Sequence, residues 1–369
     1  MRSGEASNIH SFKNNNSPVI NALIKCGFGK AYVARNADLQ EHGLSETEAV
    51  QHFLEFGHRE RRVGGMPAPG AITELLQATV NDANRGELLR AVAASALQLA
   101  GETNDGVQSL ADELVAALSI GNASPYVIFG DSHSTLYFRP VTIEGHYLVP
   151  IRIVCSGGSA LGLANPNSKS GYRRQLLEWI NTHLPIIESG IPFFFKFGQV
   201  DAEFVSVFDR IRKNEKEFIS SSFESFSSKS ADAYFSFLND VSQIIPKSQI
   251  HVCSIFPPTL SDACWSQGYV NAHIGFLEGD RGLEELEEGI RLLDKPSYKT
   301  RVSLHSSYNA AIRNRCACAG YIYVDDFTPL LDRDGLVQHQ YLINHNGSDH
   351  HFKHESIANH ITSTIIKYI

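Results

Sequence analysis

The chain changes its hydrophobic pattern near residue 125. From this point short apolar runs, rich in β-branched and aromatic residues, alternate with more polar stretches. Runs of this kind are typical of strands that are buried on both faces of a sheet. We predict five strands, at residues 126–129, 151–155, 193–197, 250–255 and 321–324.

Helical patterns lie between these runs and after the last of them. They cover residues 172–183, 202–217, 230–244, 303–315 and 355–366. Strands that alternate with helices predict a parallel sheet covered on both sides, with right-handed crossovers. Ligands bind such sheets beyond the carboxyl ends of the strands, so that is where functional residues are expected.

The residues before position 122 have a different pattern. Residues 1–28 are rich in Ser and Asn, which predicts a mobile tail. Ser45 and Glu48 form a capping box, and Gly57 stands where the helix that follows should end. Further helices are predicted at 71–80, 85–99 and 105–119. We therefore expect a tail (1–28), a helical region (29–122) and an α/β domain (123–369).

Composition narrows the class of protein. The 369 residues are 43% hydrophobic and 20% charged, as in ordinary soluble domains, and the net charge of −8 argues against a nucleic-acid partner. No window offers the ~20 consecutive apolar residues that a membrane span needs. The polar segment Met1–Asn16 does not resemble a secretory signal, so we expect a cytoplasmic protein with six reduced cysteines.

Reactive side chains and glycines follow the predicted strands. Ser132 comes directly after the first strand, within Gly130-Asp131-Ser132-His133. Gly157 and Gly158 follow the second strand, where their backbone N–H groups can approach a developing oxyanion.

The third strand and the last helix add further polar groups. Gln199 and Asp201 follow the third strand, and Asp349 and His351 precede the last helix. A serine hydroxyl becomes a good nucleophile when an imidazole accepts its proton and a carboxylate orients that imidazole. The sequence therefore predicts Ser132 as nucleophile, His351 as base and Asp349 as its partner.

Residues 125–369 resemble the SGNH (GDSL-like) hydrolase superfamily in their Gly-Asp-Ser turn, glycine turn, third turn and late Asp/His pair. The resemblance implies a three-layer α/β/α flavodoxin-like fold, with Gly157 or Gly158 as a backbone oxyanion donor. Val200 stands where the family has its oxyanion asparagine. We expect Gln199 to replace that amide in a rotated turn, and His133 to contact substrate. For Asp201 two roles stay open, which are contact with substrate and hydrogen bonding that holds the turn together.

Four neighbouring histidines, His345, His350, His351 and His354, raise the question of a metal site. Only His350 and His354 have the spacing to share a helical face, and no matching cysteine or carboxylate cluster accompanies them. A serine mechanism needs no metal. We expect none.

Two features connect the chain to glycans. The Asp-x-His spacing of Asp349 and His351 is similar to that of SGNH-type polysaccharide O-acetyltransferases, whose motif continues with an aromatic residue, as Phe352 does here. Residues 31–39 and 52–62 resemble a small helical module that accompanies bacterial glycan-building enzymes. These likenesses imply acetyl transfer to, or ester hydrolysis on, a carbohydrate in bacterial surface-polysaccharide metabolism, with acetyl-CoA as the donor if transfer dominates.

Three alternatives remain open at this point. In the first, the protein is a general carbohydrate or lipid esterase with the same residues and no acyl donor. In the second, which Val200 motivates, it is a non-catalytic glycan-binding module. In the third, it is a scaffold whose N-terminal region recruits glycan-assembly enzymes.

Overall fold

The computed structural model describes residues 18–25, 27–57, 77, 81, 123–137, 141–143, 146–188, 190–265, 283–343 and 349–369. The chain forms two compact units, one of residues 1–123 and 145–147 and the other of residues 124–144 and 148–369. The helices predicted at 71–80, 85–99 and 105–119 lie outside the described residues, apart from Gln77.

Short helices form the described part of the first unit. They are α1 (Pro18–Lys25), α2 (Phe28–Arg35), α3 (Ala37–Gln40), α4 (Glu46–His52) and the π-helix η1 (Phe53–Gly57). The predicted capping box is present, because the Ser45 hydroxyl accepts from the Glu48 N–H and the Glu48 carboxylate accepts from the Ser45 N–H. Phe28, Tyr32 and Phe53 form the aromatic core of these helices.

The expected tail over residues 1–28 is wrong in its second half. Pro18–Lys25 is helical, and Leu23 within it is fully buried. Pro18 suits the first position of a helix, and Ile20, Leu23 and Ile24 recur at helical spacing. The sequence shows a short apolar patch at residues 20–24 that could dock, but the Ser- and Asn-rich composition around it favoured a tail.

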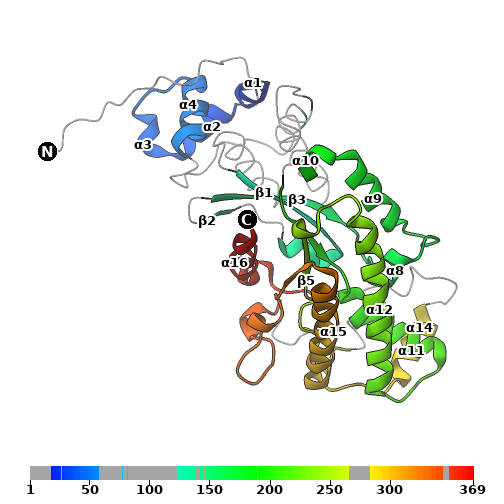
Figure 1. The fold of residues 1–369 in the computed structure, drawn as a ribbon. Helices are drawn as coiled ribbons and strands as arrows, with labels where there is room; N and C mark the ends of the chain where they lie inside the picture. Colours follow the sequence, from blue (N-terminus) through cyan, green and yellow to red (C-terminus); the bar gives the residue numbers. More distant parts are fainter. Residues whose placement is uncertain are drawn as a thin grey trace. The chain divides into compact units, whose positions relative to one another are not determined.

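A six-stranded sheet forms the centre of the second unit (Figure 1), with the strand order β2-β3-β1-β4-β5-β6. β1 pairs with β4, β4 with β5 and β5 with β6, all in parallel. Leaving out β2, the order is the flavodoxin-like one, as predicted. The strands are β1 (Ala123–Gly130), β2 (Val141–Ile143), β3 (His146–Val154), β4 (Phe193–Lys196), β5 (Ile250–Cys253) and β6 (Ile322–Val324).

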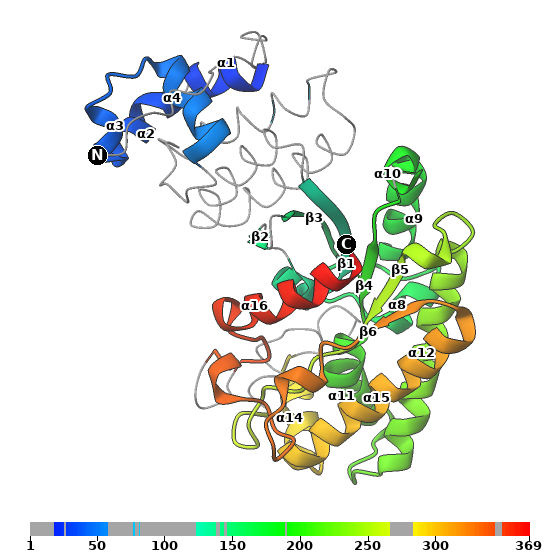
Figure 2. The same ribbon diagram turned by 60° about the vertical axis from the view of Figure 1, so that its left-hand side comes forward.

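Helices cover both faces of this sheet (Figure 2). On one face, Phe129 contacts Trp179 of α9 (Tyr172–Thr182), and Phe195 contacts Phe237 of α12 (Ser220–Val241). On the other face, Ile128 belongs to a buried cluster that includes three isoleucines of α16 (His354–Ile365). Successive strand residues thus face opposite helical layers, which gives the predicted three-layer α/β/α architecture.

The remaining elements connect these layers. They are the helices α8 (Ala160–Ala164), α10 (Leu184–Glu188), α11 (Ser206–Lys213), α14 (Leu283–Leu292) and α15 (Tyr298–Ala319), the π-helix η3 (Asp201–Val205) and the 3₁₀ helices η2 (Ser132–Tyr137), η4 (Lys247–Gln249), η6 (Thr328–Leu330), η7 (His339–Tyr341) and η8 (Ile366–Tyr368). None of the helices within the described ranges has the length and apolar character to cross a membrane.

All five predicted strands and the five predicted helices of this unit are present, with three differences in the helices. α15 extends beyond the predicted residues 303–315 at both ends. α12 begins at Ser220, ten residues before its predicted start. Its first turns are rich in serine, which favours helices only weakly, so the helical signal in the sequence there is small. The helix predicted at 202–217 consists of the π-helical turn η3 followed by α11.

Candidate active site

Ser132 lies at the carboxyl end of β1, on the first turn of η2. The turn that carries it is tight, because a Cβ atom at Gly130 would come within 2.6 Å of the Ser134 side chain and 2.7 Å of the Lys196 carbonyl oxygen. Only glycine fits there. The backbone N–H of Ser132 has no hydrogen-bond partner among the described residues. At the sheet edge, Ser132 thus offers both its hydroxyl as a candidate nucleophile and its own backbone N–H as a hydrogen-bond donor.

A chain of two hydrogen bonds connects Ser132 to a carboxylate. The Nε2 atom of His351 lies 3.2 Å from the Ser132 Oγ atom, and the Nδ1 atom of His351 lies 3.1 Å from the Asp349 Oδ1 atom. Because an ionised carboxylate can only accept, Nδ1 carries the proton and the Nε2 lone pair faces the serine. The structure therefore brings together the three residues that the sequence predicted as nucleophile, base and orienting acid.

The segment that carries Asp349 and His351 is held by hydrogen bonds within it and from elsewhere in the fold. The Thr259 hydroxyl donates to the Asp349 carbonyl oxygen at 2.7 Å, and the His351 N–H donates to the Asp349 side chain at 2.8 Å. One further bond comes from a ring nitrogen of His133, 3.3 Å from the His350 carbonyl oxygen. The base is thus fixed on both sides before any substrate binds.

The electrostatics of the pair suit a neutral base beside an ionised acid. Burial alone would raise the pKa of Asp349, but the hydrogen bond from the His351 N–H and the two nearby imidazoles hold it below its usual value. Burial lowers the pKa of His351, and the neighbouring His133 lowers it further, which together outweigh the effect of Asp349. His351 therefore remains neutral, and able to accept a proton, at neutral pH.

The glycine turn after β3 lies next to the Ser132 turn, because the Cys155 N–H donates to the Gly130 carbonyl oxygen at 2.7 Å. Of its two glycines, Gly158 donates its N–H to the Cys155 carbonyl oxygen. Gly157 has a φ of 69°, and its N–H has no partner among the described residues. Gly157, rather than Gly158, is the available oxyanion donor.

Gln199 is engaged elsewhere in the protein. Its amide nitrogen donates to Glu203 Oε1 at 2.7 Å and to the Phe256 carbonyl oxygen at 3.2 Å, and its amide oxygen accepts from the Phe256 N–H. Both amide hydrogens are therefore used in joining the ends of β4 and β5. We correct the expectation that Gln199 replaces the family's asparagine, since no donor remains on this side chain.

Asp201 is fully buried and does not face the groove beside the glycine turn. Its carboxylate accepts from the N–H groups of Ala160 and Leu161, and from the Ser230 hydroxyl. Asp201 thus holds the first turn of α8, just after the glycine turn. Of the two roles that the sequence left open for Asp201, this position suits hydrogen bonding that holds the backbone and not contact with substrate.

His133 is 1% exposed and pairs with its own neighbour Asp131. The two residues repeat the local geometry of Asp349 and His351, with an Nδ1 to Oδ1 distance of 3.1 Å and a backbone N–H that donates to the same carboxylate oxygen. Burial would lower the pKa of His133, but Asp131 and then Glu203 raise it above its usual value. Its burial argues against the substrate contact we expected. The Asp-x-His pattern was visible in the sequence but was not recognised as a second pair.

A groove of about 720 Å³ begins at the glycine turn. Gly157 and Val200 lie at its wall, so the side chain in the position of the family's asparagine does face this groove. Most of its other lining residues carry hydroxyl, amide or ammonium groups, among them Asn165, Ser168 and Lys169. The groove can therefore form many hydrogen bonds with a polar ligand.

Comparison with known proteins gives only distant likenesses. No protein-family model and no curated protein matches the chain. Among solved structures, it is similar to a protein described as a platelet activating factor from Streptococcus pneumonia (12% identity, 66% of this chain and 82% of that one, TM-score 0.36). It is also similar to phospholipase A1 from Streptomyces albidoflavus (14%, 67% and 100%, 0.34) and an extracellular lipase from Streptomyces rimosus (13%, 66% and 97%, 0.32). At this distance the assignment of a reaction rests on the chain's own residues.

Proposed function

We propose that this protein is a serine-dependent esterase or acyltransferase that works through an acyl-serine intermediate. The observation that carries the proposal is the hydrogen-bonded series from Ser132 through His351 to Asp349. Ser132 is partly exposed, so an ester can reach it. Nucleophile, base and orienting acid in this order are the groups that acyl transfer requires.

In the first half of the reaction, the Ser132 Oγ atom attacks the acyl carbonyl carbon while its proton moves to His351 Nε2. Asp349 stabilises the imidazolium that forms. The N–H groups of Ser132 and Gly157 stabilise the negative charge on the carbonyl oxygen. The carbon–oxygen bond of the leaving alcohol then breaks, and the alcohol takes the proton from His351, which leaves the acyl group on Ser132.

In the second half, His351 removes a proton from the acceptor hydroxyl. The acceptor oxygen attacks the acyl carbon, the bond between this carbon and the Ser132 Oγ atom breaks, and His351 returns the proton to Oγ. Water as acceptor gives hydrolysis, and a sugar hydroxyl gives acyl transfer. The same residues therefore serve both outcomes, and the occupant of the acceptor position decides between them.

The substrate we propose is an acetylated carbohydrate of a bacterial surface polysaccharide. Two observations support it. Most residues that line the groove at Gly157 carry hydrogen-bonding groups, which can bind the hydroxyls of a sugar. The Asp349-x-His351 spacing is similar to that of SGNH-type O-acetyltransferases, and in the transfer direction acetyl-CoA in the cytoplasm is the donor that we propose.

Hydrolysis of p-nitrophenyl acetate by the full chain tests the reaction. We expect turnover that falls by about 10³-fold or more in Ser132→Ala. Ser236→Ala provides the matched control, because Ser236 is exposed on α12. Equal rates for Ser132→Ala and the unaltered protein would remove Ser132 from the mechanism.

Acceptor competition tests the finer assignment. The protein is incubated with acetyl-CoA, or with an acetylated oligosaccharide, in the presence and absence of unacetylated sugar acceptors. We expect the acetyl group on the sugar acceptor in the transfer direction. If free acetate were the only product in every mixture, the protein would be an esterase and the transferase assignment would be excluded.

A further inference from the structure

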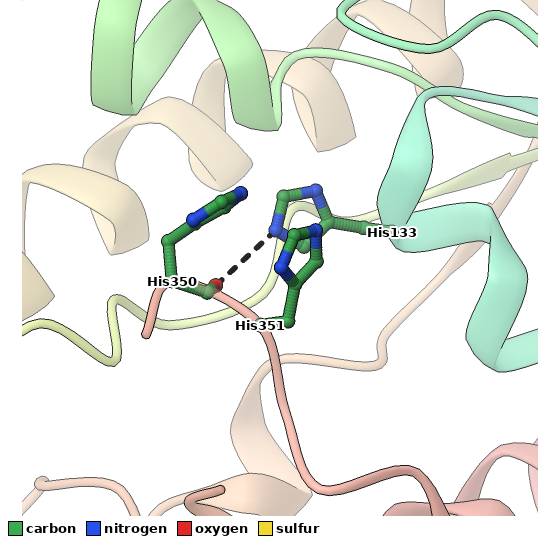
Figure 3. A group of neighbouring side chains, drawn as sticks. All are labelled: His133, His350 and His351. Carbon is green, nitrogen blue, oxygen red and sulfur yellow. Dashed lines mark hydrogen bonds between the residues drawn. The ribbon is translucent and has the colours of Figure 1, made fainter. Parts of the chain in front are cut away.

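Three histidines gather beside the proposed nucleophile (Figure 3). His133 comes from η2, whereas His350 and His351 come from the loop before α16. Each offers a ring nitrogen, and the three atoms lie within 4.8 Å of one another. The sequence concealed this group, because more than two hundred positions separate His133 from the other two.

Carboxylates already orient two of the three imidazoles. The Nδ1 atom of His133 lies 3.1 Å from Asp131, and that of His351 lies 3.1 Å from Asp349. Histidines that bind metals usually donate their second N–H to a carboxylate in this way, which fixes the tautomer and makes the free nitrogen more basic. The other nitrogen, Nε2, lies 3.2 Å from the Ser132 Oγ atom in His351 and 3.3 Å from the His350 carbonyl oxygen in His133, so a metal bound at these two nitrogens replaces both contacts.

The spacing and the type of these groups suit a zinc ion. Zinc–nitrogen bonds are about 2.0–2.1 Å long, so the three nitrogens must each move inward by on the order of 1 Å. Rotation of the half-buried rings of His350 and His351 can supply much of this shift. Three imidazoles with a fourth position open are a common zinc-binding set.

We propose that His133, His350 and His351 form a binding site for zinc that controls the activity of Ser132. The Nε2 lone pair of His351 cannot bind the metal and accept the Ser132 proton at the same time. Bound zinc therefore withdraws the base from the nucleophile. The binding site stands on its own geometry, while its inhibitory effect rests on the proposed esterase function.

Cobalt(II), which substitutes for zinc and absorbs visible light when bound by histidines, tests the site without any assay of activity. Tag-free protein is treated with a chelator, desalted and titrated with Co²⁺. We expect one bound ion per chain, which added Zn²⁺ displaces. His350→Gln should lose this absorption, and His339→Gln, which replaces an exposed histidine of η7, should retain it.

His133→Gln gives a second variant of the site, and circular dichroism checks its folding because His133 is buried. Folded His133→Gln should also lose the Co²⁺ absorption. The proposed metal site would be overturned if His350→Gln showed the same Co²⁺ absorption as the unaltered protein. It would also be overturned if the unaltered protein bound no ion. Because this readout needs no substrate, a protein without esterase activity would refute the proposed function and leave the metal site to be judged separately.

Zinc inhibition tests the regulatory part. Each variant is compared with its own rate in the presence of chelator. We expect Zn²⁺ to inhibit the unaltered protein and His339→Gln reversibly, and His350→Gln to need about 10- to 100-fold more zinc for the same inhibition. Co²⁺ binding at the three histidines without any loss of esterase rate would contradict the inhibitory role.

Discussion

The Nε2 atom of His351 lies 3.2 Å from the Oγ atom of Ser132, although 219 positions separate the two residues in the sequence. The fold produces this contact by ending β1 at a tight glycine turn and by tying the loop before α16 to the neighbouring segments. A serine and an imidazole in this arrangement have the geometry for proton transfer. The mechanism that follows from it makes several predictions.

Asp349→Asn should lower the turnover number by on the order of 10²- to 10⁴-fold and change KM little, because the amide carries no charge to stabilise the imidazolium. The thermal midpoint should hardly change, since the Asp349 side chain is 39% exposed. Asp334→Asn, at an exposed position, is the matched control. Steady-state kinetics on both variants checks this prediction, and full activity in Asp349→Asn would rule out its orienting role.

Gly157→Ala should reduce turnover beyond its effect on stability. Gly157 and Gly190 both have positive φ angles, of 69° and 81°, so alanine at either position costs about 1–2 kcal/mol of stability. Only Gly157 offers its N–H in the turn beside Ser132. We expect Gly157→Ala and Gly190→Ala to lose comparable amounts of unfolding free energy. Only Gly157→Ala should have a lower turnover number. Equal turnover numbers in the two variants would exclude Gly157 as an oxyanion donor.

Glu203 should make the unfolding free energy depend on pH. Burial raises the pKa of Glu203 to about 7, against 4.5 for the free side chain, and its Oε2 atom has no partner among the described residues. Between these two values the folded state holds a proton that the unfolded state has lost. Glu203 therefore destabilises the fold progressively as pH rises from 4.5 to 7, and adds no further change above that.

Glu203→Gln should remove this dependence. Its gain in unfolding free energy over the unaltered protein should grow by on the order of 3 kcal/mol between pH 4.5 and pH 8. Urea unfolding at several pH values measures it, with Glu224→Gln, at an exposed position of α12, as control. A gain that is constant with pH would show that Glu203 is not protonated in the fold.

The strands were the part of the fold that the sequence predicted best. Phe193, Phe194 and Phe195 place apolar side chains on both faces of their strand. Both faces can be buried only in a sheet that other elements cover on its two sides. The helix α1 was missed, because three apolar residues in a polar segment give a weak signal. β2 was also missed, since a three-residue strand carries too little pattern to recognise.

The sequence could predict those residues of the candidate site that have a reactive side chain and stand next to a clear strand or helix. Ser132, Asp349 and His351 each follow or precede a clear element, and parallel strands bring such segments to one edge. Gln199 could not be assigned from the sequence, because its role depends on the distance to Phe256 in the segment after β5. The group of three histidines likewise depends on tertiary contacts alone.

Covalent labelling of the 369-residue chain with a fluorophosphonate tests the central claim most directly. The probe reacts with serines whose hydroxyl is activated by a base, and peptide mapping by mass spectrometry locates the adduct. With a chelator present, we predict one adduct per chain, on Ser132, and none in Ser132→Ala. An unlabelled protein at every pH, or an adduct on another serine such as Ser134, would contradict the account.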